Sequence, residues 1–265
     1  MPDRFEEREA RRRTFDEVAD LYATARRPYP QELIDDLVDL AGLERGSEVV
    51  EIGCGTGQAT VALASSGLGI TCVELGGRLA AIARRNLEAY PEVDVIQADF
   101  EQWEAPRRDY DAVVSFNAFH WIDPARRYEL TARLLRAHGA LAFVEPRHVV
   151  PEGGDPIFLE MQDDYRAVGL AGDDPPGPPE DVPDFRDEIE ASGLFENVVV
   201  RRHLFTATYT VDEFIALRDT ASDHRLLPGA VREELHRLKR RRIEARPGGN
   251  VEMTHLAVLH VARAR

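Results

Sequence analysis

Short apolar runs alternate with helical stretches through the first half of this 265-residue chain. The pattern predicts strands at 48–52, 70–74, 93–97, 111–116 and 140–144, and helices at 58–64, 78–89 and 124–137. Continuous apolar strands separated by helices are typical of a parallel sheet that is covered on both faces. This alternation therefore predicts an α/β fold with a doubly wound sheet.

Two helices are expected before the first strand, and the chain changes character after Pro146. The further expected elements are helices at 14–23, 31–41, 157–170, 184–192 and 211–246, and late strands at 197–209 and 251–263. Segment 171–183 carries five prolines and is expected to be a loop. The late strands complete a sheet of seven, which we expect to be mostly parallel with the last strand antiparallel.

We expect the whole chain, residues 1–265, to form a single domain, because its length is within reach of one domain with insertions. The expected core sheet covers about 42–146 together with 196–209 and 251–263. The remaining segments, expected to form helical cap insertions, are 1–41, 147–195 and 210–250.

The composition narrows the class of partner. A formal net charge of −15 argues against nucleic acid or an anionic membrane as the main partner, so a small molecule is expected. Two cysteines, Cys54 and Cys72, cannot form a disulfide framework. The N-terminal segment lacks the apolar stretch of a signal peptide, and no window resembles a membrane span. We therefore expect a cytoplasmic monomer or homodimer.

The stretch "VVEIGCGTGQ" (49–58) places three glycines, Gly53, Gly55 and Gly57, directly after the first predicted strand. A glycine-rich turn between the first strand and first helix of such a sheet is where nucleotide-like ligands bind. The dinucleotide fingerprint has a third glycine at the position that Gln58 occupies here. The loop therefore predicts a ligand of this kind, but the spacing departs from that of a dinucleotide site.

Carboxylates follow or lie within the first three predicted strands, at Glu51, Glu74 and Asp99. Glu74 can accept hydrogen bonds from both ribose hydroxyls of a nucleoside. Asp99 can accept from an adenine amine, with Phe100 near the ring, although it can also cap the following turn. A rim of carboxylates repels a pyrophosphate and suits a ligand with an amine and a sulfonium.

These motifs, "VVEIGCGTGQAT", "VEL" and "QADF", resemble the cofactor motifs of class I S-adenosylmethionine-dependent methyltransferases, and the likeness covers about residues 14–146. The resemblance implies a Rossmann-like fold, S-adenosylmethionine as cofactor and S-adenosylhomocysteine as product. It implies no metal. The residues that it places at the cofactor in this part of the chain are Glu51, Gly53, Gly55, Gly57, Gln58, Glu74, Leu75, Asp99 and Phe100.

Two flanking segments are similar to the small-molecule group that includes trans-aconitate methyltransferases. "YATARRPYP" (22–30) resembles an entry segment of that group, which implies that Tyr22 and Arg26 help to close over the methionyl end. Tyr22 also lies on an apolar helical face, where it can be a core residue. "SFNAFHWID" (115–123) resembles the segment after the fourth strand, where Asn117 is expected to orient substrate or cofactor.

His120 follows the fourth predicted strand and is the candidate general base. A base is needed only if the acceptor is protonated, as a phenol, alcohol or amine is. The alternative is that Phe119, His120 and Trp121 form a wall of the cofactor pocket. We favour the wall, because the group that this chain resembles carries the same trio whatever its acceptor.

The acceptor pocket is expected between the N-terminal helices and the insertions 147–195 and 210–250. The polar or aromatic residues that can face it are His148, Tyr165, His224 and Arg225. The basic stretch 236–246 can attract an anionic acceptor, but a solvated helix face is the favoured interpretation.

The sequence thus predicts a methyltransferase acting on a small molecule, with oxygen as the favoured acceptor atom. Three alternatives stay open. The chain can bind the cofactor without transferring its methyl group, as a regulatory or scaffold protein, or it can be a cofactor-assisted cyclase. A nicotinamide-dependent dehydrogenase is disfavoured by Gln58 and by the carboxylate rim.

Overall fold

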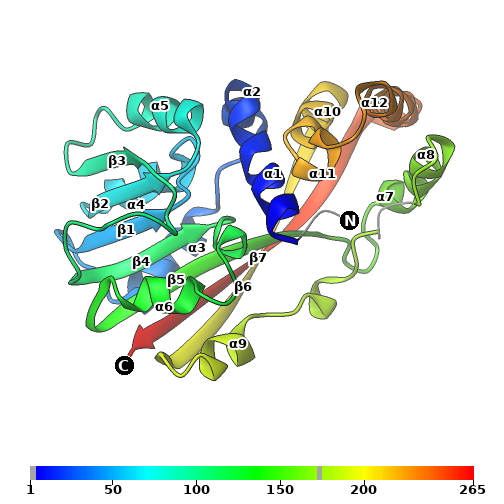
Figure 1. The fold of residues 1–265 in the computed structure, drawn as a ribbon. Coiled ribbons are helices and arrows are strands. Elements are labelled where there is room, and N and C mark those ends of the chain that lie inside the picture. Colours follow the sequence, from blue (N-terminus) through cyan, green and yellow to red (C-terminus); the bar gives the residue numbers. More distant parts are fainter. Residues whose placement is uncertain (1–3, 172–174) are drawn as a thin grey trace. The chain divides into compact units, whose positions relative to one another are not determined.

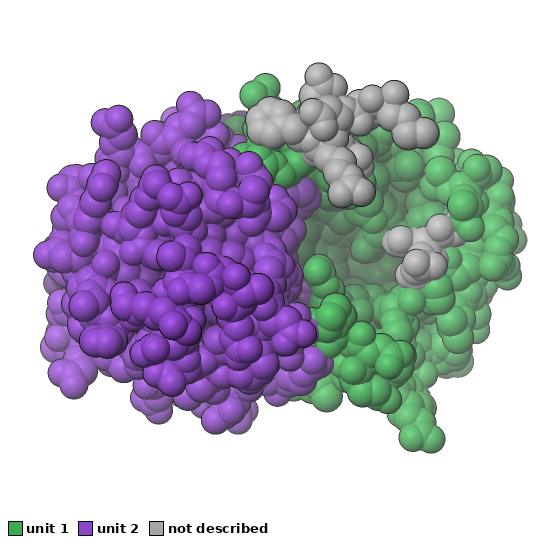
Figure 2. Space-filling model, turned by 60° about the horizontal axis from the view of Figure 1, so that its bottom comes forward, with its two compact units in different colours: residues 1–26, 147–183, 204–256 green, residues 27–146, 184–203, 257–265 purple. Residues whose placement is uncertain are grey.

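A computed structural model describes residues 4–171 and 175–265 (Figure 1). The chain divides into two compact units, coloured in Figure 2. Unit 1 comprises residues 1–26, 147–183 and 204–256, and unit 2 comprises 27–146, 184–203 and 257–265. No helix within the described ranges has the length and apolar character that a membrane crossing needs. The expected division into core sheet and cap stays a prediction.

Seven strands form one sheet in the order β3-β2-β1-β4-β5-β7-β6 (Figure 1). Their bounds are β1 Glu48–Ile52, β2 Gly69–Glu74, β3 Val93–Gln97, β4 Tyr110–Phe116, β5 Leu135–Val149, β6 Phe195–Thr210 and β7 Asn250–Ala264. Pairing is parallel between β1 and β2, β1 and β4, β2 and β3, and β4 and β5. The sheet is mixed, with an antiparallel pair, which confirms the predicted seven-stranded, doubly wound fold.

The central strands β1 and β4 are buried on both faces, as their continuous apolar runs predict, whereas in the edge strand β3 only Val95 is buried. In β1, Val49 and Val50 are buried, and in β4 Val113 and Val114 are buried. The helices of this unit are α3 Gln31–Ala41, α4 Gln58–Ser65, α5 Gly77–Asn86, α6 Arg127–Ala132 and α9 Arg186–Ala191, with the 3-10 turn η1 Phe119–Trp121. Because side chains of both strand faces are shielded from water, the strand ends and loops are left to carry ligand chemistry.

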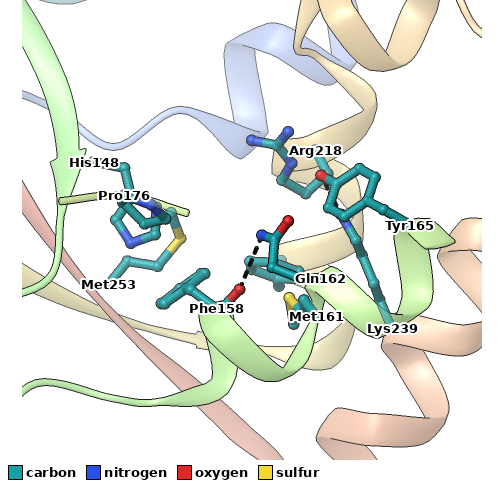
Figure 3. A pocket seen from close by; sticks show the side chains of 10 residues that line it. His148, Phe158, Met161, Gln162, Tyr165, Pro176, Arg218, Lys239 and Met253 are labelled. Atoms are coloured by element: carbon teal, nitrogen blue, oxygen red, sulfur yellow. Dashed lines mark hydrogen bonds between the residues drawn. The ribbon is translucent and has the colours of Figure 1, made fainter. Parts of the chain in front are cut away.

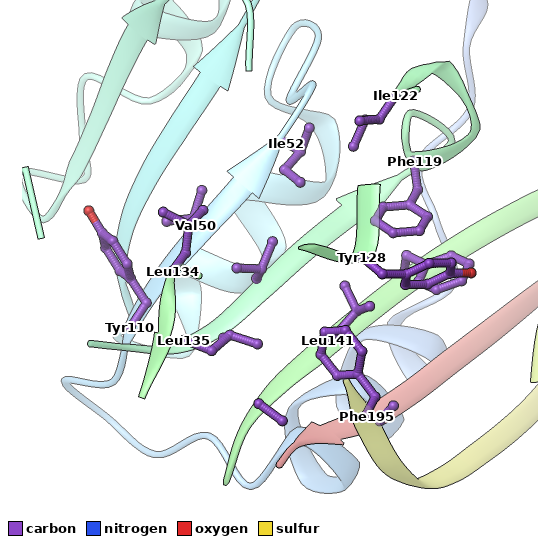
Figure 4. Packing of buried hydrophobic residues seen from close by; sticks show 14 of the residues in the cluster. Val50, Ile52, Tyr110, Phe119, Ile122, Tyr128, Leu134, Leu135, Leu141 and Phe195 are labelled. Carbon is purple, nitrogen blue, oxygen red and sulfur yellow. The ribbon is translucent and has the colours of Figure 1, made fainter. Parts of the chain in front are cut away.

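Figure 4 shows the hydrophobic cluster of unit 2, in which Phe119 and Tyr128 lie side by side. An aromatic stack joins three elements of this unit. The ring of Phe143 on β5 lies 4.3 Å from that of Phe119 and 4.6 Å from that of His260 on β7. The guanidinium of Arg127 packs against three aromatic rings. It lies 5.3 Å from the centre of the Phe119 ring, 5.4 Å from that of Tyr128 and 5.1 Å from that of Phe185. This packing fixes the turn η1, which begins at Phe119.

Unit 1 is built mainly from helices around its own hydrophobic cluster. They are α1 Arg4–Glu17, α2 Ala19–Ala25, α7 Ile157–Glu160, α8 Gln162–Ala167, α10 Val211–Asp219, α11 Ser222–Arg225 and α12 Gly229–Glu244, with the 3-10 turns η2 Pro179–Asp181 and η3 Pro247–Gly249. A capping box between Thr210 and Glu213 starts α10. Ile157, Phe214 and Ile243 are buried in the cluster, so the helices of this unit support one another.

Several predicted helices are shorter than expected. The helix expected at 124–137 ends at Ala132, and β5 begins at Leu135. Leu135 pairs with Tyr110 and Ala140 with Ala112, so extra residues bulge out of the strand between these pairs. Leu134 and Leu135 are buried at the junction between α6 and β5, and buried leucines fit the hydrophobic pattern of a helix as well as that of a strand. The pattern of hydrophobic residues therefore did not show where the helix ends.

The other differences are interruptions rather than changes of type. The expected helices 157–170 and 211–246 each correspond to two or more shorter helices, and the expected helix 14–23 is divided between α1 and α2. Pro228 precedes α12 and cannot continue the preceding helix. Residues 172–174, near the start of the proline-rich segment 171–183 that was predicted to be a loop, lie outside the described residues.

Candidate functional site

The loop between β1 and α4 turns tightly on three glycines with positive φ. The φ angles are 67° at Gly53, 59° at Gly55 and 85° at Gly57. Residues with a Cβ are strained in this left-handed region, whereas glycine is not. The amide of Gly53 donates to the carbonyl of Val73 (2.9 Å), and that of Gly57 donates to the carbonyl of Cys54 (2.9 Å). The loop is thereby held against the end of β2.

Gly53 is needed for space as well as for backbone conformation. A Cβ added there would lie 2.6 Å from the Cβ of Ala118. We expect Gly53→Ala to lower the free energy of unfolding by about 3 kcal/mol, combining left-handed strain with overpacking. Urea unfolding monitored by circular dichroism measures the loss.

Gly46→Ala is the matched control, because Gly46 also has a positive φ (87°) but nothing lies within 4 Å of its added Cβ. It should cost about 1–2 kcal/mol, the strain alone. In the double variant Gly53→Ala, Ala118→Gly, the clash with the Ala118 Cβ is removed, so the part of the loss that exceeds the backbone strain should be recovered. Equal losses in the two single variants would show that the contact with Ala118 has no cost.

Glu74 ends β2 and connects two loops through its carboxylate. Its Oε2 accepts from the amide of Gly55 (2.9 Å), and its Oε1 accepts from the amide of Gly76 (2.8 Å). The side chain is buried. Each carboxylate oxygen has capacity for a second hydrogen bond. The carboxylate therefore fixes the glycine loop and can also accept donors from a ligand.

Glu51 lies in β1 and is 1% exposed. Its Oε2 accepts from the hydroxyl of Thr60 (2.7 Å) and from the thiol of Cys72 (3.9 Å). Burial raises the pKa of Glu51 to about 7; the Thr60 hydrogen bond opposes this rise and the charge of Glu74 adds to it. Because the Glu51 carboxylate contacts protein groups, it can influence a ligand indirectly, through the glycine loop.

The raised pKa of Glu51 predicts how stability depends on pH. From pH 4.5 to 7 the native protein keeps this proton while the unfolded chain releases it. The free energy of unfolding should therefore fall as pH rises through that window, by about 3 kcal/mol from this group. The Glu51→Gln variant should lack that fall.

Urea unfolding from pH 4.5 to pH 8 tests the prediction, because it gives the free energy of unfolding of Glu51→Gln and of the wild type at each pH. The variant should gain about 3 kcal/mol relative to the wild type across the window. Glu92→Gln, at an exposed position of the same unit, should leave the pH profile unchanged. A Glu51→Gln difference that does not vary with pH would contradict the assigned pKa.

Asp99 follows β3 and caps the next turn. Its Oδ1 accepts from the amide of Glu101 (3.1 Å), and its Oδ2 accepts from the side-chain amide of Gln102 (3.1 Å). Phe100 is buried in the hydrophobic cluster of unit 2. The capping interpretation of Asp99 is thus present in the structure, and its contact with an adenine amine stays a prediction.

Three further predicted residues border the same loops. Gln58 is the first residue of α4, Leu75 follows Glu74, and Asn117 follows β4. Asn117 has a φ of 58°, in the region that favours glycine, and its amide donates to the carbonyl of Val144 (2.8 Å). Backbone strain of this kind concentrates at functional sites. Ligand contacts of all three stay predictions.

His120 is held by a buried carboxylate. Its Nδ1 lies 2.8 Å from Oε2 of Glu145, whose side chain is 3% exposed. A carboxylate accepts hydrogen bonds, so this contact favours the tautomer with its proton on Nδ1 and its lone pair on Nε2. The ring also packs at 4.7 Å from that of Trp121. This arrangement supplies an oriented imidazole that can take a proton at Nε2.

Sequence reasoning missed Glu145. The signal was available, because Glu145 directly follows the predicted strand 140–144, much as Asp99 lies two residues after the predicted strand 93–97. The other oxygen, Oε1, is buried without a hydrogen-bond partner among the described residues. Buried polar atoms of this kind need an explanation, which a functional role would give.

Tyr22 and Arg26 belong to unit 1, whereas the other predicted cofactor residues belong to unit 2. Within unit 1 the Arg26 guanidinium lies 5.1 Å from the Tyr22 ring, and its Nε donates to the hydroxyl of Thr220 (3.1 Å). The Tyr22 ring contacts that of Phe15 edge-on at 6.1 Å. Their role at the methionyl end stays a prediction.

Within residues 4–171 and 175–265, no cluster of three or more His, Cys, Asp or Glu side chains could hold a metal ion.

The chain is similar to known methyltransferases. Residues 49–139 match a family described as a methyltransferase domain. This segment runs from the middle of β1 to the start of β5, so it contains the glycine loop, Glu74, Asp99 and His120. The match therefore covers the part of unit 2 that the sequence singled out.

Three curated relatives show the extent of the likeness. An uncharacterized methyltransferase of Mycobacterium tuberculosis is 29% identical over 156 residues, covering 54% of this chain and 61% of that protein. A malonyl-acyl-carrier-protein O-methyltransferase of Paenibacillus is 30% identical, covering 56% and 55%. A trans-aconitate 2-methyltransferase of M. tuberculosis is 37% identical over 90 residues, covering 33% and 32%. The chain thus spans less than two thirds of each relative.

Among solved structures, the YcgJ protein of Bacillus subtilis has a TM-score of 0.55 at 15% identity. The match covers 89% of this chain and 99% of that one. At this identity the likeness concerns the fold, and it extends beyond residues 49–139.

Proposed function

We propose that this chain transfers a methyl group from S-adenosylmethionine to a small molecule, and the match of residues 49–139 to a methyltransferase domain supports this. Oxygen is the favoured acceptor atom. The observation that carries the proposal is the position of the Glu74 carboxylate at the edge of the glycine loop, where it accepts hydrogen bonds from the backbone amides of Gly55 and Gly76. The name of one relative, a malonyl-acyl-carrier-protein O-methyltransferase, supports oxygen as the acceptor atom. The name of another, a trans-aconitate 2-methyltransferase, supports a small molecule as the acceptor.

The residues present fit this cofactor. Glu74 would accept the ribose hydroxyls, and Asp99 the adenine amine. Three positive-φ glycines let a ligand approach the backbone of the loop closely. Carboxylates favour the cationic sulfonium and amine, and they disfavour a pyrophosphate. When bound, the cofactor supplies a methyl group that is already activated for displacement.

The protein would contribute positioning, exclusion of water and removal of a proton. We assign the last role to His120, whose Nε2 would take the proton of the acceptor hydroxyl. Glu145 would hold the ring through Nδ1 and stabilise the imidazolium that forms. An acceptor that is already a carboxylate would not need this step.

Incubation with S-adenosylmethionine labelled in its methyl group tests the proposal. A bacterial extract's small-molecule fraction supplies candidate acceptors, and label should appear in a product of low molecular mass. The matched control is the same reaction with the Glu74→Ala variant, which should leave the extract unlabelled. If the wild type binds S-adenosylhomocysteine and transfers no label to this fraction or to protein, the chain is a binding protein without transfer activity.

A further inference from the structure

Unit 1 contains a pocket that is open to solvent (Figure 3). All of its lining residues belong to this unit, and they come chiefly from α7, α8, α10 and α12. The pocket is distinct from the residues proposed to bind the cofactor.

Lys239 lines this pocket although it is 1% exposed. It is the only lysine in a sequence with 33 lysines and arginines together. Its Nζ donates to the hydroxyl of Tyr165 (2.7 Å) and lies 4.1 Å from the centre of that ring. The interpretation of 236–246 as a solvated helix face is therefore wrong for Lys239. Burying an ammonium is costly, so its placement at a pocket calls for a role.

A second cation, Arg218, lines the same end of the pocket as Lys239 and Tyr165 (Figure 3). Its Nε donates to Nε2 of His224 (3.3 Å), and it forms an ion pair with Asp223 (3.0 Å). Burial and the charges of Arg218 and Lys239 lower the pKa of His224, so this ring is neutral. None of the described residues that line the pocket is an aspartate or glutamate.

The other end of the pocket is mostly apolar. His148 and Met253 lie there, across Phe158 and Met161 from the cations (Figure 3). The His148 ring contacts that of Phe158 at 4.0 Å, and its buried Nε2 has no hydrogen-bond partner among the described residues. Burial lowers the pKa of His148 to about 3, so it offers a neutral polar atom beside apolar side chains.

We propose that this pocket binds a small molecule through a carboxylate group, placed between Lys239 and Arg218. The apolar body of the molecule lies against Phe158, Met161 and Met253. An arginine presents paired donors that suit a carboxylate, and a lysine adds a compact charge. His148 and Tyr165, which line this pocket, are two of the residues that the sequence placed at the acceptor pocket. The inference does not depend on methyl transfer, because it concerns binding alone.

Binding of hexanoate and of its neutral analogue hexanamide to the whole chain tests the proposal. Ligand-observed and protein-observed NMR titrations give both dissociation constants up to millimolar concentrations. Hexanoate should bind at least about tenfold more tightly than hexanamide, since only hexanoate carries the charge. Equal binding of the two, or saturation by neither, would overturn the proposal.

Variants locate the site. Lys239→Met should weaken hexanoate at least about tenfold without lowering the melting temperature, because an apolar residue of similar length often replaces a buried charge without loss. Arg218→Gln should also weaken the binding of hexanoate, and it replaces Lys239→Met in the test if that variant does not fold. Arg241→Gln, at an exposed position of α12, is the matched control and should bind hexanoate normally. Unchanged hexanoate binding in folded Lys239→Met or Arg218→Gln would overturn the assignment.

Discussion

Replacing Glu74 by alanine is expected to weaken the binding of S-adenosylhomocysteine by about 10³-fold. Two hydrogen bonds from ribose hydroxyls to a carboxylate contribute about 1.5–3 kcal/mol each, and about 4 kcal/mol in total corresponds to this factor. The variant also frees the amides of Gly55 and Gly76, which the carboxylate holds in the wild type. Isothermal titration calorimetry measures the change.

Two further variants separate binding from loop structure. Glu74→Gln keeps the size of the side chain and one acceptor oxygen, so it should fall between the wild type and Glu74→Ala. Glu92→Ala removes an exposed carboxylate of the same unit and should bind normally. Urea unfolding reports whether each variant is folded. Normal affinity in folded Glu74→Ala would remove Glu74 from the proposed site.

Replacing His120 by alanine is expected to lower turnover of a hydroxyl acceptor by at least about 10²-fold, the usual contribution of a positioned base. Affinity for S-adenosylhomocysteine should stay the same, because the ring acts on the acceptor. Glu145→Gln should lower turnover less and shift its pH profile, because the amide no longer stabilises an imidazolium. Initial rates with labelled cofactor, measured from pH 6 to pH 9, test both variants.

His138→Asn is the control for this series, because His138 is an exposed histidine of unit 2 with a positive φ that asparagine tolerates. It should keep full turnover. If His120→Ala binds the cofactor and turns over at the wild-type rate, the ring is a pocket wall, which is the alternative that the sequence favoured.

Much of the sheet could be predicted because its signals are local. The apolar runs of β1, β2 and β4 are largely buried, and β3 lies at the edge of the sheet. The structure places all four strands within one residue of the predicted bounds. Glu74 was selected for its position at the end of a predicted strand, and the structure shows its carboxylate on the glycine loop. Features that depend on a residue's immediate neighbours in the chain could therefore be predicted from the sequence.

Features set by distant contacts were not accessible. The partner of His120 is Glu145, 25 residues away, and the partner of Lys239 is Tyr165, 74 residues away. A basic stretch such as 236–246 is most often solvated, and burial of one lysine depends on the helix packed against it. The start of β5 likewise depends on pairing with β4, which hydrophobic periodicity does not contain.

Calorimetric titration of the wild-type chain with S-adenosylhomocysteine and, separately, with NAD tests the central claim most directly. The carboxylates Glu51, Glu74 and Asp99 and the glycine loop that ends at Gln58 predict micromolar binding of the thioether, about −8 kcal/mol, and no binding of NAD. Binding of NAD without binding of S-adenosylhomocysteine would contradict the account.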